Sequence, residues 1–408
     1  MRRHRVVITG LGVVSSIGIG ARAFCEALRA GKSGITEITS FDTTGFPFRR
    51  AGEIREFDHR HWVRRLDPAS IGKTSQLAIA ASRLALEDAR IDPADTEGSR
   101  CGVSVGTTDG ETLLIERFNE DWVRHGLEGF HGRYMAEAPA GRIAVNVARD
   151  LGLEGEVNTF ATACAAGNYA IGHAYDLVST GEAPFMLCGG ADSLSRKTFA
   201  GFFRLNAIAP LVCQPFDRNR QGLLTGEGAG MLLVERREDA ILRRARIYAE
   251  VLGYGLSCDG VHMTSPDRDS IATAMRRAIH QAGLRPADVS YVCAHGTGTR
   301  LNDLTEAAAI HQVFEGSPPP VSSVKSMIGH TMGAASAIAA SACALAIYEG
   351  FLPPTINSVE PDPECALDCV PNRARDAEVN VAQNNSFAFG GNNAILVLGR
   401  EEWTSHRL

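Results

Sequence analysis

EVNTFATACAAGNYAIGHAYDLVSTGEAPFMLCGG, residues 156–190, decides the fold class of this chain of 408 residues. Residues 156–161 favour a β-strand, residues 165–180 are small and helix-compatible, and residues 184–189 form a second apolar run. A strand, a helix and a strand at this spacing predict a βαβ unit. Cys164 falls where the first strand passes into the helix. The stretch therefore predicts an α/β fold with a cysteine at a strand-to-helix junction.

A second series of the same kind occupies the C-terminal part of the chain. Strands are predicted from about residue 247 and at 291–294, 321–324 and 394–398, with helices at 270–283, 302–314 and 333–349. Further upstream, residues 74–90 have helical spacing and residues 101–106 form a buried strand. We see no flexible linker or low-complexity tract. The pattern predicts two similar α/β halves, residues 1–250 and 251–408, joined in one compact unit.

Composition excludes several classes of function. Hydrophobic residues make up 44% and charged residues 22%, as in ordinary soluble globular proteins. No apolar run approaches 20 residues, which predicts no membrane span. The net charge of −6 and the lack of a basic stripe argue against nucleic acid as a partner. The ten cysteines contain no C-x-x-C pair, so neither a metal site nor a disulfide framework is expected and a cytoplasmic location is favoured.

Two other regions allow more than one interpretation. RVVITGLG, residues 5–12, reads as a strand followed by a glycine turn, and its start resembles a dinucleotide fingerprint. The third glycine and the acidic residue of that fingerprint are not convincingly placed, so we predict a first strand rather than a nucleotide site. Residues 109–139 are long, polar and aromatic-bearing. They are expected to line a pocket or to meet a second subunit.

Two segments carry candidate nucleophilic and acid–base groups. At Cys164 the backbone N–H groups and dipole of the following helix are expected to lower the thiol pKa. The alternative is a buried structural cysteine. AHGTGT, residues 294–299, places His295 on an open turn, where the hydroxyls of Thr297 and Thr299 would hold amide groups of a ligand. The alternative there is a loop histidine satisfied by its own backbone.

Two further segments complete the set. VSSVKSMIGHTMGA, residues 321–334, places Lys325, one of only four lysines, five residues before His330. Its flanks are apolar and small, and a buried ammonium demands partners. NSFAFGGN, residues 385–392, has two aromatic residues and two glycines before the last strand. This composition predicts a mobile loop under steric control.

Together these segments resemble the β-ketoacyl-[acyl carrier protein] synthases of the elongating type II class, which are condensing enzymes of the thiolase superfamily. The resemblance runs through nearly the whole chain. It includes VVITGLG at 6–12, SGI at 33–35, GGAD at 189–192, PFD at 215–217, GEGAG at 226–230, HMTSP at 262–266 and FGG at 389–391. It implies a thiolase-like fold of two similar halves with a layered α-β-α-β-α architecture.

The resemblance also implies a mechanism. Cys164 would take an acyl group from a phosphopantetheine thioester, with the backbone N–H groups of Cys164 and Phe389 as the oxyanion hole. His295 and His330 would stabilise the enolate formed when malonyl-carrier protein loses carbon dioxide. Lys325 would hold the electrostatics and orientation of this site. The product is a 3-ketoacyl chain two carbons longer, and neither a metal nor a cofactor beyond the carrier's phosphopantetheine is expected.

Other roles follow from the same resemblance. Thr297 and Thr299 match residues that hold the pantetheine arm, and Phe389 matches a gate that responds to acylation. Arg64 and Arg65 fall where the family carries basic residues that dock the acidic carrier protein. The alternative for this pair is a solvated charged helix.

Three positions depart from the family pattern. Ala388 stands where a glycine usually separates the two gate aromatics, which would restrict the backbone. Asn392 replaces a frequent threonine. Asp109 falls near the acyl pocket where an apolar residue is common, so we expect either a preference for a polar or unsaturated chain or a contact with a partner subunit.

Several assignments remain open from the sequence. One is a homodimeric synthase of fatty-acid elongation, and another is the ketosynthase subunit of a type II polyketide line paired with a chain-length factor; Ala388 and Asp109 favour the second slightly. The chain could also be the non-catalytic chain-length factor, but its cysteine, lysine and two histidines are intact. A thiolase acting on coenzyme A thioesters would need a second catalytic cysteine, and Cys365 and Cys369 lack the required glycine-rich motif.

Overall fold

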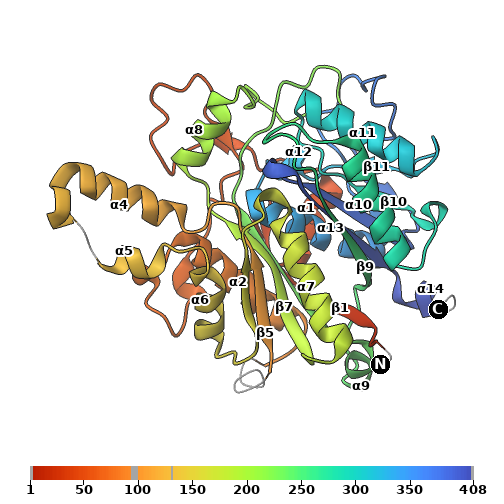
Figure 1. Cartoon of the computed structure of the whole chain (residues 1–408), viewed down its shortest axis with the longest axis horizontal. Helices are drawn as coiled ribbons and strands as arrows, with labels where there is room; N and C mark the ends of the chain where they lie inside the picture. Colours follow the sequence, from red (N-terminus) through yellow and green to blue (C-terminus); the bar gives the residue numbers. More distant parts are fainter. Residues whose placement is uncertain (1–2, 93–99, 130–131, 406–408) are drawn as a thin grey trace.

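The computed structural model describes residues 3–92, 100–129 and 132–405. Among the described residues its main sheet has eleven strands, ten of which form two sets of five, while the short β2 pairs with β1 (Figure 1). The first set is β1 (Val6–Ser15), β5 (Gly102–Gly106), β6 (Val157–Phe160), β7 (Phe185–Asp192) and β8 (Gly228–Arg236). The second set is β9 (Ala249–Cys258), β10 (Tyr291–Cys293), β11 (Val321–Ser322), β14 (Val381–Phe387) and β15 (Asn392–Gly399).

The two sets repeat one topology. Within the described residues the strand order is β11-β10-β14-β15-β9-β1-β8-β7-β5-β6. Read from the outer edge of the sheet to its centre, each set places its strands in the order third, second, fourth, fifth, first, counted along the chain. In both sets the second strand pairs in parallel with the third and the fourth, and the remaining pairs are antiparallel. The first strands of the two sets pair with each other, with Val6 opposite Val251. The predicted boundary at residue 250 falls on the second residue of β9.

Helices fill the space between and outside the two half-sheets. The central pair contacts strands of both sets and the outer pairs each cover one set (Figure 1). The central helices are α7 (Ala166–Thr180) and α13 (Ala335–Glu349), and the outer ones are α2 (Lys73–Asp88) with α6 (Arg142–Leu151) and α10 (Arg268–Gln281) with α11 (Arg300–Val313). The result is the layered α-β-α-β-α architecture that the sequence predicted.

The central helix α13 is apolar enough to resemble a membrane-spanning helix, but it lies inside the protein. The window Met332–Glu349 is long and apolar enough to cross a membrane, but 89% of it is buried inside the protein. Every residue from Ala335 to Ile347 is buried. An apolar helix without a polar face is expected where two sheets cover it from both sides.

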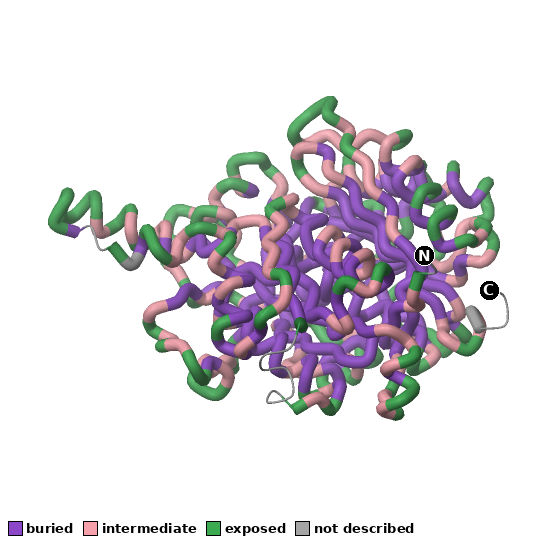
Figure 2. The backbone as a smooth tube through the Cα atoms, turned by 60° about the horizontal axis from the view of Figure 1, so that its bottom comes forward, coloured by how far each residue is buried: buried purple, intermediate pink, exposed green. Residues whose placement is uncertain are grey.

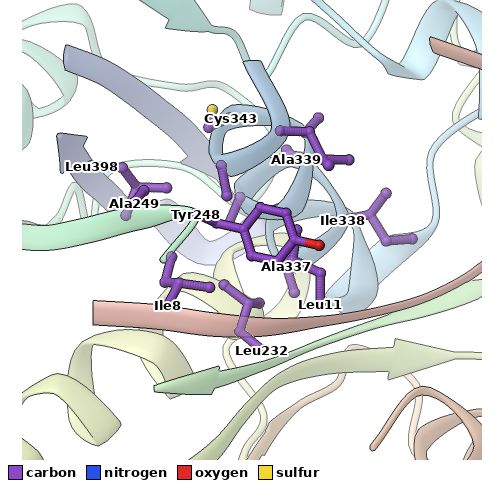
Figure 3. Close-up of a cluster of buried hydrophobic side chains, with 14 of the residues drawn as sticks. Ile8, Leu11, Leu232, Tyr248, Ala249, Ala337, Ile338, Ala339, Cys343 and Leu398 are labelled. Atoms are coloured by element: carbon purple, nitrogen blue, oxygen red, sulfur yellow. The ribbon is translucent and has the colours of Figure 1, made fainter. Parts of the chain in front are cut away.

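One hydrophobic core joins the two halves. Figure 3 shows Ile8 and Leu11 of β1, Leu232 of β8 and Ile338 of α13 in the same cluster as Leu398 of β15. All five side chains are buried. Because strands from both sets share this core, the halves form one packed unit.

The first strand corrects a prediction. We expected a strand followed by a turn at Gly10 and Gly12, but β1 continues to Ser15. The two glycines instead allow α2 to approach: a Cβ would lie 2.1 Å from the Ala85 carbonyl oxygen at Gly10 and 1.7 Å from that of Ala81 at Gly12. They are close-packing glycines and form no nucleotide loop.

The described parts of segment 109–139, which are residues 109–129 and 132–139, include two helices that extend from the body as an arm (Figures 1 and 2). It contains α4 (Thr112–His125), a 3-10 turn (Gly126–Gly129) and α5 (Gly132–Glu137). The ring centroid of Phe118 lies 5.9 Å from that of Trp122 and 5.8 Å from that of Tyr134. These aromatic contacts give the arm a small core of its own. Its exposed large apolar residues are Trp122, Val123, Leu127 and Met135.

The remaining elements are peripheral or short. The helices are α1 (Ala21–Ala30), α8 (Arg196–Arg204), α9 (Arg237–Leu242), α12 (Lys325–Ile328) and α14 (Glu401–Ser405). The short strands are β2 (Gly18–Ile19), β3 (Thr36–Glu37), β4 (Arg50–Ala51), β12 (Phe351–Leu352) and β13 (Arg375–Asp376).

Candidate active site

Two matching turns face each other at the centre of the molecule. After β6, Ala163 adopts a left-handed conformation with φ 49° and leads through a 3-10 turn (Ala163–Ala165) into α7. After β11 and α12, Met332 adopts φ 52° and leads through an equivalent turn (Met332–Ala334) into α13. A left-handed conformation is costly for a residue other than glycine and is held only by its surroundings. Cys164 and Gly333 occupy the corresponding positions of the two turns.

His295 lies two residues beyond the end of β10 and is held from two sides. Its backbone N–H donates to Glu306 Oε1 at 2.8 Å, and the N–H of Gly296 donates to Glu306 Oε2 at 2.8 Å. Its carbonyl oxygen accepts from Lys325 Nζ at 2.5 Å. The ammonium of Lys325 is therefore fixed behind His295, and the buried lysine has the partner that the sequence required.

The second histidine has a defined tautomer. His330 Nδ1 accepts a hydrogen bond from the Met332 N–H at 3.1 Å, so the proton of the neutral ring resides on Nε2. The rings of His295 and His330 have centroids 5.5 Å apart and an interplanar angle of 84°. His295 Nδ1 is buried and has no hydrogen-bond partner among the described residues. The pair can thus offer N–H groups to an oxygen bound between them.

Burial controls the charges of these groups. It lowers the pKa of both imidazoles well below 6.5, and the charge of Lys325 acts in the same direction. Both rings are therefore neutral near pH 7. Burial also raises the pKa of the Cys164 thiol to about 12, while Lys325 opposes this change. The expected lowering of the thiol pKa is wrong for this state, because burial outweighs the nearby positive charge.

These residues open onto one pocket of about 410 Å³. The predicted site residues that line it are Cys164, His295, His330, Thr297, Thr299 and Phe389. Thr297 Oγ1 lies 2.9 Å from Thr299 Oγ1, on the side of the pocket formed by the turn after His295. The structure therefore brings the cysteine, both histidines and both threonines together, with Lys325 behind His295.

The aromatic loop forms one wall of this pocket. Phe387 ends β14, and Phe389 begins a 3-10 turn (Phe389–Gly391). Phe389 is 37% exposed and its ring centroid lies 5.6 Å from that of Phe202. Ala388 has φ −132° and ψ 154°, an extended backbone that any residue adopts. The alanine is therefore compatible with this conformation of the loop, whereas Gly390 and Gly391 have φ values of 82° and 86°.

Several supporting residues were not predicted. Glu306 is fully buried beneath His295, where burial raises its pKa to about 7, and it also accepts from Asn385 Nδ2 at 3.1 Å. Asp303 accepts from the N–H of Gly298 at 3.2 Å and pairs with the buried guanidinium of Arg220. The pair of carboxylates at positions 303 and 306, one helical turn beyond the threonines, was the signal available in the sequence.

Asp109 and the two arginines lie outside the pocket lining. The Asp109 carboxylate accepts from the Thr198 hydroxyl and lies 3.2 Å from Lys197 Nζ. Arg64 and Arg65 lie in a loop, not on a charged helix, because their backbone N–H groups both donate to the buried carboxylate of Asp150. Their carrier-docking role and the acyl-pocket role of Asp109 remain predictions. Among the described residues, no group of three or more His, Cys, Asp or Glu side chains is placed to hold a metal ion.

A five-layered fold of two repeated halves, with a cysteine and two neutral histidines in one pocket, defines a thiolase-like condensing enzyme. Sequence comparison makes the class specific, because the domain described as Beta-ketoacyl synthase, N-terminal, matches residues 3–240 and the corresponding C-terminal domain matches residues 248–359. The chain belongs to the β-ketoacyl synthase family. It is a ketosynthase, an acyltransferase of fatty acid or polyketide condensation.

Individual relatives agree with this. The chain is 38% identical to 3-oxoacyl-[acyl-carrier-protein] synthase 2 of Synechocystis sp., over 97% of this chain and 98% of that protein. It is 37% identical to the protein of the same name from Staphylococcus aureus, over 98% and 99%. Among solved structures, the ishigamide ketosynthase/chain length factor superposes with a TM-score of 0.96 and 49% identity, over 97% and 99% of the two chains. A β-ketoacyl synthase from Burkholderia phymatum superposes with a TM-score of 0.90 and 35% identity, over the same shares.

Proposed function

We propose that this chain is the catalytic ketosynthase subunit of a type II polyketide synthase. It would condense an acyl group on Cys164 with malonyl-carrier protein, and it would pair with a chain-length factor. The observation that carries the catalytic assignment is the meeting of Cys164, His295 and His330 in one pocket with Lys325 fixed behind them. A non-catalytic partner has no need of this arrangement.

The first half-reaction is acyl transfer. The Cys164 sulfur attacks the thioester carbonyl of an acyl-carrier protein, the carbon–sulfur bond to phosphopantetheine breaks, and the thiol proton goes to the departing sulfur. The N–H groups of Cys164 and Phe389 would hold the oxyanion. Because burial keeps the resting thiol protonated, Lys325 would assist by stabilising the thiolate as it forms.

The second half-reaction begins when malonyl-carrier protein binds. Its carboxylate leaves as carbon dioxide, and the N–H groups of His295 and His330 would stabilise the enolate oxygen that remains. The enolate carbon then attacks the Cys164 thioester, so that a carbon–carbon bond forms and the carbon–sulfur bond breaks. The cysteine sulfur takes up a proton, and a 3-ketoacyl chain two carbons longer leaves on the carrier.

The pocket suits a substrate on a long flexible arm. Thr297 and Thr299 line it beyond the histidines, where their hydroxyls would hold the amides of phosphopantetheine. Phe389 would gate the passage between the arm and the acyl chain. Arg64 and Arg65 would attract the acidic carrier protein, and no resident cofactor is required.

The polyketide assignment and the proposed heterodimer rest on the similarity of this chain to solved structures. The identity of 49% with the ishigamide ketosynthase/chain length factor exceeds the identities of 37% and 38% with the two synthases named above. A second structure, described as a type II polyketide acyl-carrier protein in complex with its ketosynthase, superposes with a TM-score of 0.89 and 31% identity. The exposed apolar residues of the arm would contact the chain-length factor. A homodimeric synthase of fatty-acid elongation in the cytoplasm is the second candidate, favoured by the named curated relatives.

The test combines intact-protein mass with co-purification. The enzyme is incubated with acyl-carrier proteins of different chains, and the mass of wild type is compared with that of Cys164→Ala. We expect an acyl-sized gain in wild type only, and a co-purifying homologue that lacks the cysteine. A gain in both proteins would refute Cys164 as the nucleophile. A fully active homodimer would refute the chain-length factor and leave the fatty-acid alternative.

A further inference from the structure

The two matching turns are fastened by hydrogen bonds that cross between the halves. Ser386, on β14 of the second half, donates from its hydroxyl to the Cys164 carbonyl oxygen at 2.9 Å. Asp192, the last residue of β7 in the first half, accepts at Oδ2 from the Gly333 N–H at 2.6 Å. Each half therefore holds the turn that belongs to the other. The strands that supply the two side chains, β7 and β14, are the fourth strands of their sets.

Both turns need such support. Ala163 and Met332, which precede the held residues, adopt left-handed backbone conformations that are costly for residues other than glycine. A conformation of this kind persists only where neighbouring contacts determine it. The two cross-half bonds act on the residue that immediately follows each strained position.

Asp192 is built to aim one oxygen at the His330 turn. Its side chain is fully buried, and Oδ1 accepts from the Thr107 hydroxyl at 2.7 Å and from the Asp109 N–H at 3.0 Å. Oδ2 accepts from the Thr108 N–H at 2.7 Å as well as from Gly333. Three bonds from residues 107–109 thus fix the carboxylate, and the fourth holds Gly333.

The held turn in the second half controls a histidine. Met332, between His330 and Gly333, donates its N–H to His330 Nδ1 and so sets both the tautomer and the direction of Nε2. A shift of Gly333 would move Met332 and turn the imidazole. The held turn in the first half carries the Cys164 sulfur and N–H, which are the nucleophile and one oxyanion donor of the proposed mechanism.

We propose that Asp192 and Ser386 are positioning residues for different half-reactions. Asp192 acts through His330 on decarboxylation, and Ser386 acts through Cys164 on acyl transfer. The inference rests on the proposed roles of Cys164 and His330, and it adds two residues that touch neither substrate nor product.

The experiment measures the half-reactions separately in the enzyme as it purifies, with any partner subunit. Acyl transfer is the rate at which the Cys164 mass adduct appears. Decarboxylation is the rate of carbon dioxide release from malonyl-carrier protein by enzyme that is already acylated, so that it does not depend on the first step. The variants are Asp192→Ala and Ser386→Ala, with Asp192→Asn and Ser386→Thr as matched conservative variants. Thermal unfolding of each variant identifies any that fail to fold.

We expect Asp192→Ala to slow decarboxylation about 10- to 100-fold, the cost of a misplaced reacting group, while acyl transfer changes less than about threefold. Ser386→Ala should show the converse. Asp192→Asn keeps one oxygen that can accept from Gly333, but its amide nitrogen cannot accept from the Asp109 N–H, so it should restore part of decarboxylation. Ser386→Thr keeps the hydroxyl and should restore most of acyl transfer. Equal losses in both half-reactions, or no loss in either, would overturn the inference.

A further variant, His330→Ala, tests the proposed function independently. It must slow decarboxylation whether or not Asp192 matters. If His330→Ala leaves carbon dioxide release unchanged, the proposed role of His330 is wrong, and the inference about Asp192 is overturned with it. If His330→Ala slows release and Asp192→Ala does not, only the inference fails.

Discussion

Replacing Gly12 by alanine tests the packing on which the first half of the fold depends. The new Cβ would lie 1.7 Å from the carbonyl oxygen of Ala81 and 2.7 Å from the N of Ala85, both in the backbone of α2. Cβ atoms essentially never approach other heavy atoms closer than 3.0 Å, so the helix must retreat from β1 by more than 1 Å. No side-chain rotation can relieve the contact.

The energetic cost follows from the interface that opens. α2 has eleven buried residues, including Leu77 and Ala81, and packs on β1, β7 and β8 as well as on α6. A gap of 0.5–1 Å already forfeits about a quarter to a half of the dispersion energy of each contact. We therefore expect Gly12→Ala to lower the free energy of unfolding by about 3 kcal/mol or more, at the upper end of overpacking substitutions.

Urea unfolding followed by circular dichroism measures this change. The matched control is Gly201→Ala, within the exposed part of α8, where a Cβ meets nothing within 4 Å. Because alanine is the better helix former, the control should be more stable than wild type by about 0.5–1 kcal/mol. A Gly12→Ala variant within about 0.5 kcal/mol of wild type would refute the close-packing explanation of this glycine.

Three further predictions concern the reaction. Lys325→Met removes a charge that lowers the pKa of both active-site imidazoles, so those pKa values should rise. Because protonation of His330 Nδ1 breaks its bond from Met332, the acid limb of decarboxylation should move to higher pH. A pH–rate profile identical to that of wild type would contradict this prediction. Arg64→Glu combined with Arg65→Glu should raise KM for the carrier protein about tenfold at low salt and less at high salt. The two side chains are exposed, and the backbone bonds to Asp150 survive the substitutions. Steady-state kinetics at two ionic strengths measure the change in KM, and unchanged kinetics would remove the pair from the docking site. Asp109→Ile should shift the acyl preference about tenfold toward saturated chains in competition assays, and an unchanged preference would argue against a pocket role.

Much of the fold was predictable because local patterns and tertiary structure agree. The small-residue helix after Cys164 and the buried strand at residues 101–106 were placed within one residue of α7 and β5. The prediction was wrong at Gly10 and Gly12, because a glycine pair signals a turn and a close helix approach equally well. The helices α1 and α8 and the strands β8 and β14 were not predicted. β8 pairs with β1 at the start of the chain, whereas α1 packs mainly on β1 and β2 and β14 pairs with β15, which are their neighbours in sequence.

The site was predictable to the same extent. Distinctive short motifs indicated Cys164, both histidines and Lys325, which the structure brings together. The contacts of Asp192 and Ser386 could not be predicted from the sequence, because each side chain bonds to a turn in the opposite half. The spacing of residues along the chain does not reveal a contact between the two halves. The alternative interpretation of Arg64 and Arg65, a solvated charged helix, was wrong for a related reason. The buried Asp150 that holds their backbone in a loop lies 85 residues or more further along the chain.

Close packing at Gly333 leaves no room for a second thiol opposite Cys164. Gly333 stands where Cys164 stands in the other half, but a Cβ there would lie 2.5 Å from the Cα of Thr107. A duplicated fold could have retained two reactive thiols facing one another, and steric exclusion prevents it here. With Cys164 as the proposed nucleophile, we expect these two turns to carry one acyl group per chain, and the turn at Gly333 would present His330 to the incoming malonyl unit. The two equivalent turns of the repeated halves therefore differ in chemistry, because one carries a thiol and the other carries only the backbone that orients His330.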